Sequence, residues 1–358
     1  MEMKITVLPE EQRKKIPEDD MQLGFGRTFT DHMFLMNYDE EKGWHDLRIQ
    51  PYGDLHLDPA CMALHYGQEI FEGLKAYRGD NDSVYLFRHK KNIERMNASC
   101  ERLVMPKMDV DEVSEALEKL VSIDRNWIPR THGCALYIRP TMIATDPFLG
   151  VRPSNTYLFY IILSPVAAYY PEGFNPVKIY VSEDYVRAVK GGMGEAKAAG
   201  NYAAGLKAQV AARKAGYAQV LWLDAIERKY VEEVGTMNIF FKFKDELVTS
   251  PLTGSILPGV TRDAVLTIAE KWSISATERN VSIDEVIEGA KNGDLKECFG
   301  SGTAAIISPV KAIRYKGEEV KVGDGSTGPT AQKLYNYILD LQYGKVEDPF
   351  GWVKRVNL

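Results

Sequence analysis

The sequence predicts an α+β fold in two domains, and three observations support this. The chain has 358 residues, 45% of them hydrophobic and 26% charged, which is enough apolar material for two cores. Strand-like and helix-like segments mix without a regular strand–helix–strand repeat. The turn-rich stretch AAYYPEGFNP separates two strand-rich halves. We therefore expect a smaller N-terminal α+β domain over residues 1–168, a linker over 169–176 and a larger C-terminal α+β domain over 177–358.

The N-terminal half has the pattern of two antiparallel strand pairs and two helices. Between residues 25 and 50, two strand-like runs flank the charged turn DEEKG, and further on LKAYR and VYLFR flank the polar turn GDNDS. The segment HKKNIERMNASCERL carries apolar residues at helical spacing and follows VYLFR directly, and an amphipathic stretch covers residues 110–123. The β-branched and aromatic runs CALYIRPTMI and TYLFYIILSPV predict buried strands.

The C-terminal half alternates shorter strands with helices. The runs VKIYVSE, QVLWLD and NIFFKF predict strands. The segment NYAAGLKAQVAARKAG is rich in alanine and ends at Gly216, which predicts one helix. A Pro-Gly turn opens the helix in ILPGVTRDAVLTIAEKW, and DEVIEGAKNG and PTAQKLYNYILDLQ predict further helices. The terminal segments, 1–20 and 345–358, carry no motif that indicates chemistry.

Composition argues against several functional classes. The formal net charge is −6 with acidic and basic residues interspersed, so we expect no nucleic-acid partner. No apolar run reaches the roughly 20 residues of a membrane helix, and the N-terminus lacks the apolar centre of a signal peptide, so we expect a cytoplasmic protein. The histidines form no paired ligand motif, and we expect no metal site. The cysteines have no CxxC spacing, which predicts buried, reduced thiols at Cys61, Cys100, Cys134 and Cys298.

A lysine in a glycine-rich loop is the strongest candidate for chemistry. The segment GGMGEAKAAGNYAAG places Lys197 among small residues, between a predicted strand and a predicted helix. A Walker loop needs Gly before the lysine and Ser or Thr after it, whereas Ala196 and Ala198 stand there. The dinucleotide fingerprint also fails, because Lys197 occupies the place of its third glycine. A surface turn with a solvated lysine, or a non-catalytic phosphate- or nucleotide-binding protein, stays an alternative at this point.

A set of blocks along nearly the whole chain resembles the branched-chain aminotransferases, which are fold-type IV pyridoxal-phosphate enzymes. The blocks keep the order and approximate spacing of that family: FGRTFTDHM, LHYGQEIFEGLKAYRG, LFRHKKNIERM, YIRPT, GGMGEAKAAGNYAAGLKAQ, EEVGTMNIFF, ILPGVTRD and FGSGTAAI. The co-occurrence of the lysine loop, EVGTMN and LPGVTR is the most specific part of the resemblance.

The resemblance implies two α/β domains with the active site at their interface and pyridoxal 5'-phosphate as the cofactor. It also implies a ping-pong transamination of L-leucine, L-isoleucine and L-valine with 2-oxoglutarate, which gives branched-chain 2-oxo acids and L-glutamate. D-amino-acid transaminase, amine transaminase and aminodeoxychorismate lyase share the fold and are the nearest alternatives.

By resemblance, the cofactor residues come from both halves of the chain. Lys197 is expected to hold the cofactor as a Schiff base and to shuttle a proton, with Gly194, Ala198 and Ala199 giving the ring close access. Glu233 is expected beside the pyridine nitrogen, whereas neighbouring Glu232 is expected in solvent. Tyr202 is expected at the ring hydroxyl. The expected phosphate residues are Arg95, Val260, Thr261 and Thr303, whereas Arg88 and Arg102 are expected to be solvated.

The resemblance also implies an apolar substrate pocket that tolerates glutamate. Arg139 is expected to meet the side-chain carboxylate of glutamate, and Thr236, Ala304 and Tyr66 are expected near the α-carboxylate. Tyr66, Leu149 and Val151 are expected to come from a second subunit, which implies a homodimer. Some family members carry CxxC just after GSGTA, but this chain has AAIIS, so thiol regulation there is not expected. The aromatic residues expected to line the pocket are Phe25, Phe71, Tyr137 and Tyr169.

Overall fold

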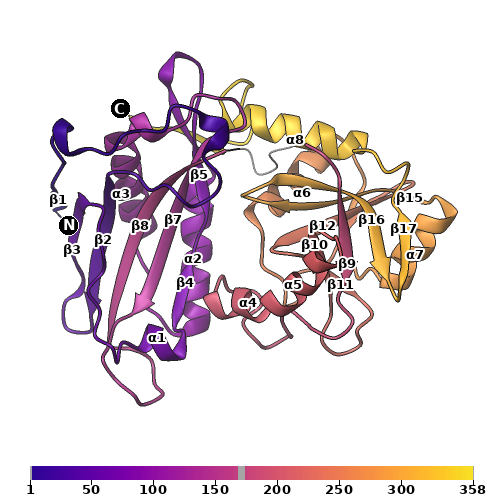
Figure 1. Cartoon of the computed structure of the whole chain (residues 1–358), viewed down its shortest axis with the longest axis horizontal. Coiled ribbons are helices and arrows are strands. Elements are labelled where there is room, and N and C mark those ends of the chain that lie inside the picture. The colour runs from indigo at the N-terminus through magenta and orange to yellow at the C-terminus, as the bar shows by residue number, and fades with distance from the viewer. Residues whose placement is uncertain (1, 168–173, 358) are drawn as a thin grey trace. The chain divides into compact units, whose positions relative to one another are not determined.

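The strands of the chain form two separate sheets in the computed structural model, which describes residues 2–167 and 174–357 (Figure 1). The chain divides into two units. The first unit contains the described residues of Met1–Pro171, Ala196–Ala199 and Leu339–Leu358, and the second contains those of Glu172–Glu195 and Gly200–Ile338. The predicted C-terminal limits therefore need correction at two segments. Residues 196–199 belong to the first unit, where Ala198 forms a bridge with Ile70. Residues 339–358 belong to it as well, and their strand Val353–Arg355 pairs with the strand Val84–Phe87.

The first unit is built on a mixed sheet of order β1-β3-β2-β8-β7-β5-β6-β18, with β4 paired to β7. Both predicted hairpins are confirmed as the antiparallel pairs β2–β3 and β5–β6. The strands are β1 (Lys4–Ile5), β2 (His32–Asp39), β3 (Gly43–Pro51), β4 (Glu69–Phe71), β5 (Leu74–Arg78), β6 (Val84–Phe87), β7 (Ala135–Ala144), β8 (Thr156–Val166) and β18 (Val353–Arg355).

Helices α2 (His89–Leu103) and α3 (Val110–Ile123) cover one face of this sheet. The short helix α1 (Met62–Tyr66) contacts β7 and begins directly after the β-bridge between Cys61 and Pro147. Their apolar residues share one core with Leu136, Ile138 and Met142 of β7. Successive strand residues face opposite ways, so Tyr137 and Arg139 lie on the other face of the sheet. Tyr137, which is expected to line the substrate pocket, thus lies on the same face as Arg139, which is expected to bind a carboxylate. Short 3-10 turns occur at Glu10–Gln12, Asp20–Gln22, Asp80–Asp82 and Arg125–Trp127.

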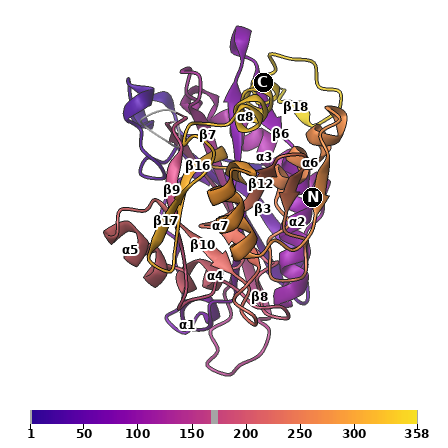
Figure 2. The same cartoon turned by 90° about the vertical axis from the view of Figure 1, so that its right-hand side faces the viewer.

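Figure 2 labels β9, β10, β12, β16 and β17 of the second unit. The strand pairing of this unit closes on itself, because β11 pairs with both β10 and β12. The ring runs β11-β10-β9-β16-β15-β12, and β13, β14 and β17 extend it. Closure buries both faces of β11, whose residues all have little solvent exposure. The strands are β9 (Val177–Val181), β10 (Gln219–Leu223), β11 (Val231–Val234), β12 (Met237–Phe243), β13 (Leu247–Thr249), β14 (Ala276–Glu278), β15 (Leu295–Gly302), β16 (Ile306–Tyr315) and β17 (Glu318–Lys321).

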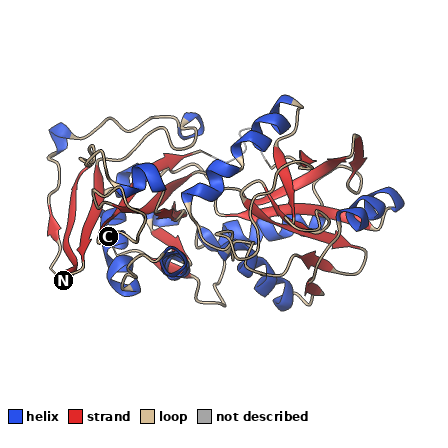
Figure 3. Ribbon diagram, turned by 90° about the horizontal axis from the view of Figure 1, so that it is seen from below, coloured by secondary structure: helices blue, strands red, loops and turns tan. Residues whose placement is uncertain are grey.

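Helices lie beside the strands in both units (Figure 3). The prediction of a single helix after the lysine loop is wrong in one respect. The helix breaks at Gly205 and forms two helices, α4 and α5. A Cβ at Gly205 would lie 3.4 Å from the Trp222 ring, so the chain passes close to this side chain. Among the described residues, no helix is long and apolar enough to cross a membrane. The remaining helices are α4 (Ala199–Ala204), α5 (Leu206–Lys214), α6 (Val260–Lys271), α7 (Ile283–Asn292) and α8 (Pro329–Gln342).

All four cysteines are free and buried, which confirms the prediction of buried, reduced thiols. Burial raises the pKa of the Cys100 thiol to about 12 and raises the pKa of Cys298 as well. A thiol with a raised pKa forms little thiolate at neutral pH, so both side chains behave as small apolar groups.

His89 at the start of α2 is expected to make the protein sensitive to acid. It is 4% exposed, and its Nε2 lies 2.7 Å from Ser114 Oγ. Burial, with the nearby charges of Lys90 and Lys354, lowers the pKa of His89 from 6.5 to about 4, although Glu118 lies 3.6 Å away. Below pH 6.5 the unfolded chain therefore takes up the proton first, and stability is lost as the pH falls towards about 4.

We expect His89→Gln to remove about 3 kcal/mol of the difference in unfolding free energy between pH 7 and pH 4. Urea unfolding of both proteins at the two pH values measures this difference. An unchanged pH dependence in the variant would show that His89 is not the group responsible.

Candidate active site

Lys197 lies in a short segment before α4 that is anchored on the first unit. Ala196 and Ala198 are 3% and 1% exposed and belong to the hydrophobic core of that unit. Ala198 forms an antiparallel bridge with Ile70 of β4. Lys197 lies between these two buried alanines but is itself only half-buried and is not part of this core. Ala198 thus packs in the core of this unit, and its expected place beside a ring stays a prediction.

The main chain of Lys197 is held on both sides. Its N–H donates to Ser99 Oγ at 2.9 Å, and its carbonyl oxygen accepts from the Phe71 N–H at 3.1 Å. The amine Nζ lies 4.9 Å from the centre of the Phe71 ring. A lysine fixed in this way and half-buried is not a flexible solvated side chain, so the solvated-turn alternative is wrong.

A buried ion pair lies next to this lysine. Glu72 is 1% exposed and accepts hydrogen bonds from Arg95 Nε at 2.8 Å and Arg95 Nη2 at 2.9 Å. Burial alone would raise the pKa of Glu72, but the charges and hydrogen bonds of Arg95, with the charge of Lys197, hold it below its ordinary value. The first unit therefore brings together the predicted residues Lys197, Phe71 and Arg95. Glu72 was not predicted.

Gly194 of the lysine loop is required by packing. A Cβ at this position would overlap the Ser255 carbonyl oxygen and would lie 2.6 Å from the Ala188 Cβ. These contacts give Gly194 a packing role, and the expectation that it gives a ring close access stays a prediction. The same contact region contains Arg187, whose Nη2 donates to the Gly194 carbonyl at 3.1 Å.

We expect Gly194→Ala to destabilise the chain by about 1–3 kcal/mol or more, because backbone atoms must move to admit the methyl group. Gly200→Ala is the matched control, since its Cβ would make an ordinary 3.5 Å contact with Met193 and lies within helix α4. The control should be neutral or stabilising. Thermal unfolding of both variants tests this, and equal melting temperatures would contradict it.

Glu233 on β11 is a buried carboxylate with a positive partner. It is 3% exposed, its Oε2 lies 2.5 Å from Arg187 Nε, and its Oε1 accepts from Asn238 Nδ2 at 3.0 Å. A buried carboxylate stays ionised only when it is paired and hydrogen-bonded, and both conditions hold here. Arg187 was not predicted because it lies outside the matching blocks, and Asn238, the last residue of EVGTMN, had no expected role.

Two charged residues expected in solvent are buried instead. Glu232 is 8% exposed and accepts a hydrogen bond from Ser255 Oγ, and burial raises its pKa. The alternation argument failed because both faces of β11 are covered in the closed ring of strands. Arg88 is 8% exposed, with its guanidinium 4.5 Å from the Trp352 ring of the C-terminal segment, and Arg102 is half-buried.

Three predicted residues share one cleft within the second unit. Tyr202, Glu233 and Thr236 line it, although they come from α4, β11 and the turn before β12. Tyr202 is half-buried and Thr236 is exposed. A phenol, a carboxylate and a hydroxyl therefore line the same narrow cleft. Its other lining residues are Arg187, Asn201, Gly205, Gln209, Trp222, Gly235 and Leu257.

The start of α6 is tied to Glu233 through Asn238. Asn238 Nδ2 also donates to the Leu257 carbonyl at 2.9 Å, and a Cβ at Gly259 would overlap its Oδ1. Gly259 is the N-cap of α6 and, as a glycine, contributes no side-chain cap. Backbone N–H groups and the helix dipole favour an anion there. The predicted phosphate residues Val260 and Thr261 form this first turn, while Thr303 and Ala304 lie half-buried between β15 and β16.

The predicted substrate residues of the first unit contact one another. The rings of Phe25 and Tyr137 meet edge to face with centres 4.9 Å apart. The Arg139 guanidinium lies 4.8 Å from the Phe71 ring and 5.3 Å from the Tyr137 ring, and its Nη2 donates to the Tyr137 hydroxyl at 3.3 Å. Its Nε is buried and has no hydrogen-bond partner among the described residues. Tyr169 lies outside the described residues.

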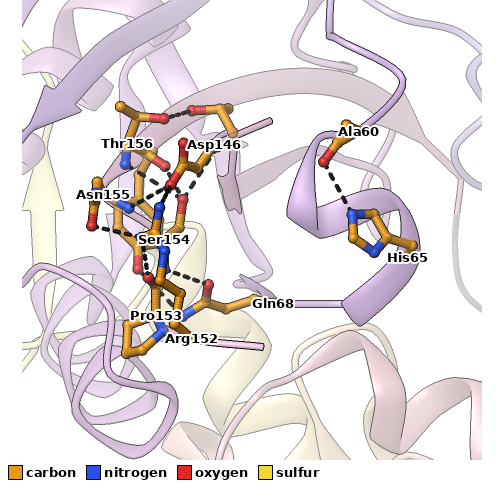
Figure 4. Close-up of polar contacts among 11 residues, drawn as sticks. Ala60, His65, Gln68, Asp146, Arg152, Pro153, Ser154, Asn155 and Thr156 are labelled. Atoms are coloured by element: carbon orange, nitrogen blue, oxygen red, sulfur yellow. Dashed lines mark hydrogen bonds and ion pairs between the residues drawn. The ribbon is translucent and has the colours of Figure 1, made fainter. Parts of the chain in front are cut away.

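The loop that carries Leu149 and Val151 is held in place by polar contacts (Figure 4). Arg152 Nη2 lies 2.6 Å from Asp146 Oδ2, its Nη1 donates to Asn155 Oδ1 at 2.8 Å, and its guanidinium lies 4.3 Å from the Phe148 ring. The Tyr66 hydroxyl donates to the Leu149 carbonyl at 2.5 Å. Even so, the side chains of Leu149 and Val151 are 74% and 85% exposed.

Comparison with known proteins decides the family. The model of the family "Amino-transferase class IV" matches residues 69–313. The chain belongs to this family. A Bacillus subtilis protein named branched-chain-amino-acid aminotransferase 2 is 55% identical over 96% of this chain and 94% of its own length. A Streptomyces coelicolor protein named a probable branched-chain-amino-acid aminotransferase is 53% identical over 92% of this chain and 91% of its own.

Solved structures of branched-chain aminotransferases share the fold. The Escherichia coli branched-chain amino acid aminotransferase superimposes with a TM-score of 0.75 at 28% identity, covering 90% of this chain and 99% of its own. The branched-chain aminotransferase of the archaeon Thermoproteus uzoniensis, solved with norvaline, gives a TM-score of 0.76 at 26% identity, covering 91% and 100%. The predicted α+β fold of type IV and the predicted aminotransferase activity are thereby confirmed, and a non-catalytic phosphate-binding protein is no longer an alternative.

Each unit of this aminotransferase carries part of the predicted site. The first unit holds Phe25, Tyr66, Phe71, Arg95, Tyr137, Arg139, Leu149, Val151 and Lys197. The second unit holds Tyr202, Glu233, Thr236, Val260, Thr261, Thr303 and Ala304.

Proposed function

We propose that this chain transfers the amino group of L-leucine, L-isoleucine or L-valine to 2-oxoglutarate, with pyridoxal 5'-phosphate as its cofactor. The observation that carries the substrate choice is the group around Arg139. Its guanidinium lies against the rings of Phe71 and Tyr137, and its buried Nε has no hydrogen-bond partner among the described residues. Such a surface suits two alternating substrates, one with an apolar side chain and one with a second carboxylate. The names of the relatives at 50–55% identity support the same choice.

The two units contain side chains of the chemical types that the proposed cofactor needs. The cofactor supplies an electron sink for negative charge at the substrate Cα. Lys197 would hold it through the side-chain amine and, once released, move a proton to and from that Cα. Glu233, kept ionised beside Arg187, would accept a hydrogen bond from the ring nitrogen. Tyr202 would hold the ring hydroxyl. The phosphate would be held by Arg95, the first turn of α6 with Val260 and Thr261, and Thr303.

The substrate would then be placed by its two ends. Phe25, Phe71 and Tyr137 would contact the branched side chain, and Arg139 would bind the side-chain carboxylate when glutamate takes that place. Thr236, Ala304 and Tyr66 would hold the α-carboxylate. Both substrates would use the same place in turn, as in a one-site ping-pong mechanism.

A homodimer is part of this proposal. Leu149 and Val151 expose large apolar side chains on a loop that makes several polar contacts, which supports contact with a second copy. Tyr66, bonded to the Leu149 carbonyl, would reach the partner subunit's site with them. Sedimentation equilibrium should give twice the mass of the chain, and a monomer would contradict this part of the proposal. The cytoplasmic location stays a prediction from the sequence.

We expect Arg139→Gln to separate the two substrate classes. It should lower kcat/KM for 2-oxoglutarate by about 10- to 100-fold, the loss expected when a charge-assisted hydrogen bond is removed. The effect on the 2-oxo acid of leucine should be small, because that substrate has no second carboxylate. Equal losses for both substrates would remove Arg139 from this role.

A panel of amino donors with 2-oxoglutarate tests the function itself. L-leucine, L-isoleucine and L-valine should be converted, and D-alanine and simple amines should not. A strong preference for D-alanine would indicate a D-amino-acid transaminase instead, and a preference for amines would indicate an amine transaminase.

A further inference from the structure

The Glu72–Arg95 pair is more elaborate than an ordinary ion pair. Two Arg95 nitrogens donate to the two oxygens of one carboxylate, at 2.8 and 2.9 Å. Two further donors hold the same carboxylate, Asn92 Nδ2 at 2.9 Å and the Gly73 N–H at 3.1 Å. The side chains of Glu72 and Arg95 are only 1% and 9% exposed. Glu72 is therefore fixed by Asn92 and Gly73, and it fixes Arg95 in turn.

A guanidinium is planar and carries five N–H donors in a rigid fork. Glu72 takes the edge formed by Nε and Nη2, so the plane of the guanidinium and the direction of its Nη1 end are set. We propose that Glu72 is a positioning residue that orients Arg95 toward the cofactor phosphate and so makes the enzyme prefer the phosphorylated cofactor to its phosphate-free form. This inference rests on the proposed function, in which Arg95 holds the phosphate.

The charge of Glu72 has an opposing effect on phosphate binding. The proposal holds if this effect is weaker than the gain from orienting Arg95. The Glu72 carboxylate reduces the net positive charge that Arg95 offers to a phosphate, which by itself would weaken binding. However, Asn92 and Gly73 also donate to this carboxylate, and an arginine already held in one orientation loses little conformational freedom when it binds. The two effects predict opposite changes when Glu72 loses its charge, so an experiment can separate them.

The experiment measures phosphate selectivity in the full-length chain. Cofactor is removed, and the chain is titrated with pyridoxal 5'-phosphate and separately with pyridoxal, with binding followed by absorbance. The ratio of the two dissociation constants reports the phosphate contact alone, because both ligands offer the same aldehyde and ring. The variants are Glu72→Gln, Glu72→Asp and Arg95→Gln. The matched control is Glu285→Gln, which removes the charge from another carboxylate that pairs with an arginine, Arg279.

We expect Glu72→Gln to reduce the preference for the phosphorylated ligand by about tenfold or more, as when the partner that orients a binding group is removed. Glu72→Asp keeps the charge and should fall between Glu72→Gln and the unmodified chain. Arg95→Gln should reduce the preference at least as much as Glu72→Gln, and Glu285→Gln should leave it unchanged.

The outcomes distinguish the inference from the function beneath it. If Arg95→Gln reduces the preference and Glu72→Gln does not, the positioning role is wrong while the role of Arg95 stands. If Glu72→Gln weakens both ligands equally, Glu72 is merely structural, and a stronger preference in that variant would mean that repulsion dominates. An unchanged preference in Arg95→Gln removes both ideas. Should Glu72→Gln fail to fold, Glu72→Asp decides by the same ratio.

Discussion

Lys197→Ala is expected to lower kcat for L-leucine by about 10⁴-fold, at the upper end of the contribution of a positioned acid–base group. Two functions end together, the covalent hold on the cofactor and the transfer of a proton at the substrate Cα. The fold should survive, because Ala196 and Ala198 provide the packing of this segment while Lys197 is not part of the core. Steady-state kinetics and the absorbance of the purified variant measure both losses.

Lys207→Ala is the matched control for that variant. Lys207 lies on α5 in the same stretch of sequence but is exposed, with its Nζ 5.3 Å from the Tyr185 ring. Its removal should leave both kcat and the cofactor absorbance unchanged. If Lys197→Ala kept full turnover and the absorbance of the bound cofactor, Lys197 would not be the catalytic residue.

Glu233→Gln is expected to lower kcat by about 10²- to 10³-fold, similar to the loss of one preorganised electrostatic partner in other active sites. The amide cannot hold a protonated ring nitrogen as a carboxylate does. The same change leaves Arg187 buried without its counter-ion, which should destabilise the chain by about 3–5 kcal/mol. Kinetics and urea unfolding measure the two effects separately.

Two further variants separate chemistry from stability at this position. The double variant Arg187→Gln with Glu233→Gln removes both charges, so it should recover part of the lost stability while kcat stays low. Glu232→Gln removes the neighbouring carboxylate, whose pKa is raised by burial, and should not destabilise the chain at neutral pH. If the double variant recovered activity together with stability, Glu233 would be a structural residue only.

The sequence predicted elements well where the signal is local. Helix α2 has the predicted limits because Ile93, Met96 and Cys100 form an apolar stripe at helical spacing within one segment. Strand β11 has only four residues and was assumed for Glu232 and Glu233 alone, and its burial on both faces depends on pairing with β10 and β12. The C-terminal segment showed no pattern. Its place depends on the β18–β6 pairing and on the contact of Trp352 with Arg88.

The same distinction holds for the site. Lys197 and Glu233 lie in motifs that resemble a family, so both could be named from the sequence alone. The ion-pair partners of Glu233 and Arg95 could not be named from the sequence. Arg187 pairs with Glu233 and Glu72 pairs with Arg95, and each pair joins separate segments of the chain. Glu232 was placed wrongly for a related reason, since alternation cannot reveal that a closed ring of strands buries both faces of β11.

The most direct test of the central claim is to find which amine holds the cofactor. Borohydride reduction of the cofactor-loaded enzyme, followed by proteolysis and mass spectrometry, locates the reduced adduct. Lys75 is a strong rival, because it is 7% exposed and burial lowers its pKa to about 8. We expect the adduct on the peptide that contains Lys197. An adduct on Lys75, or no adduct at all, would contradict the account.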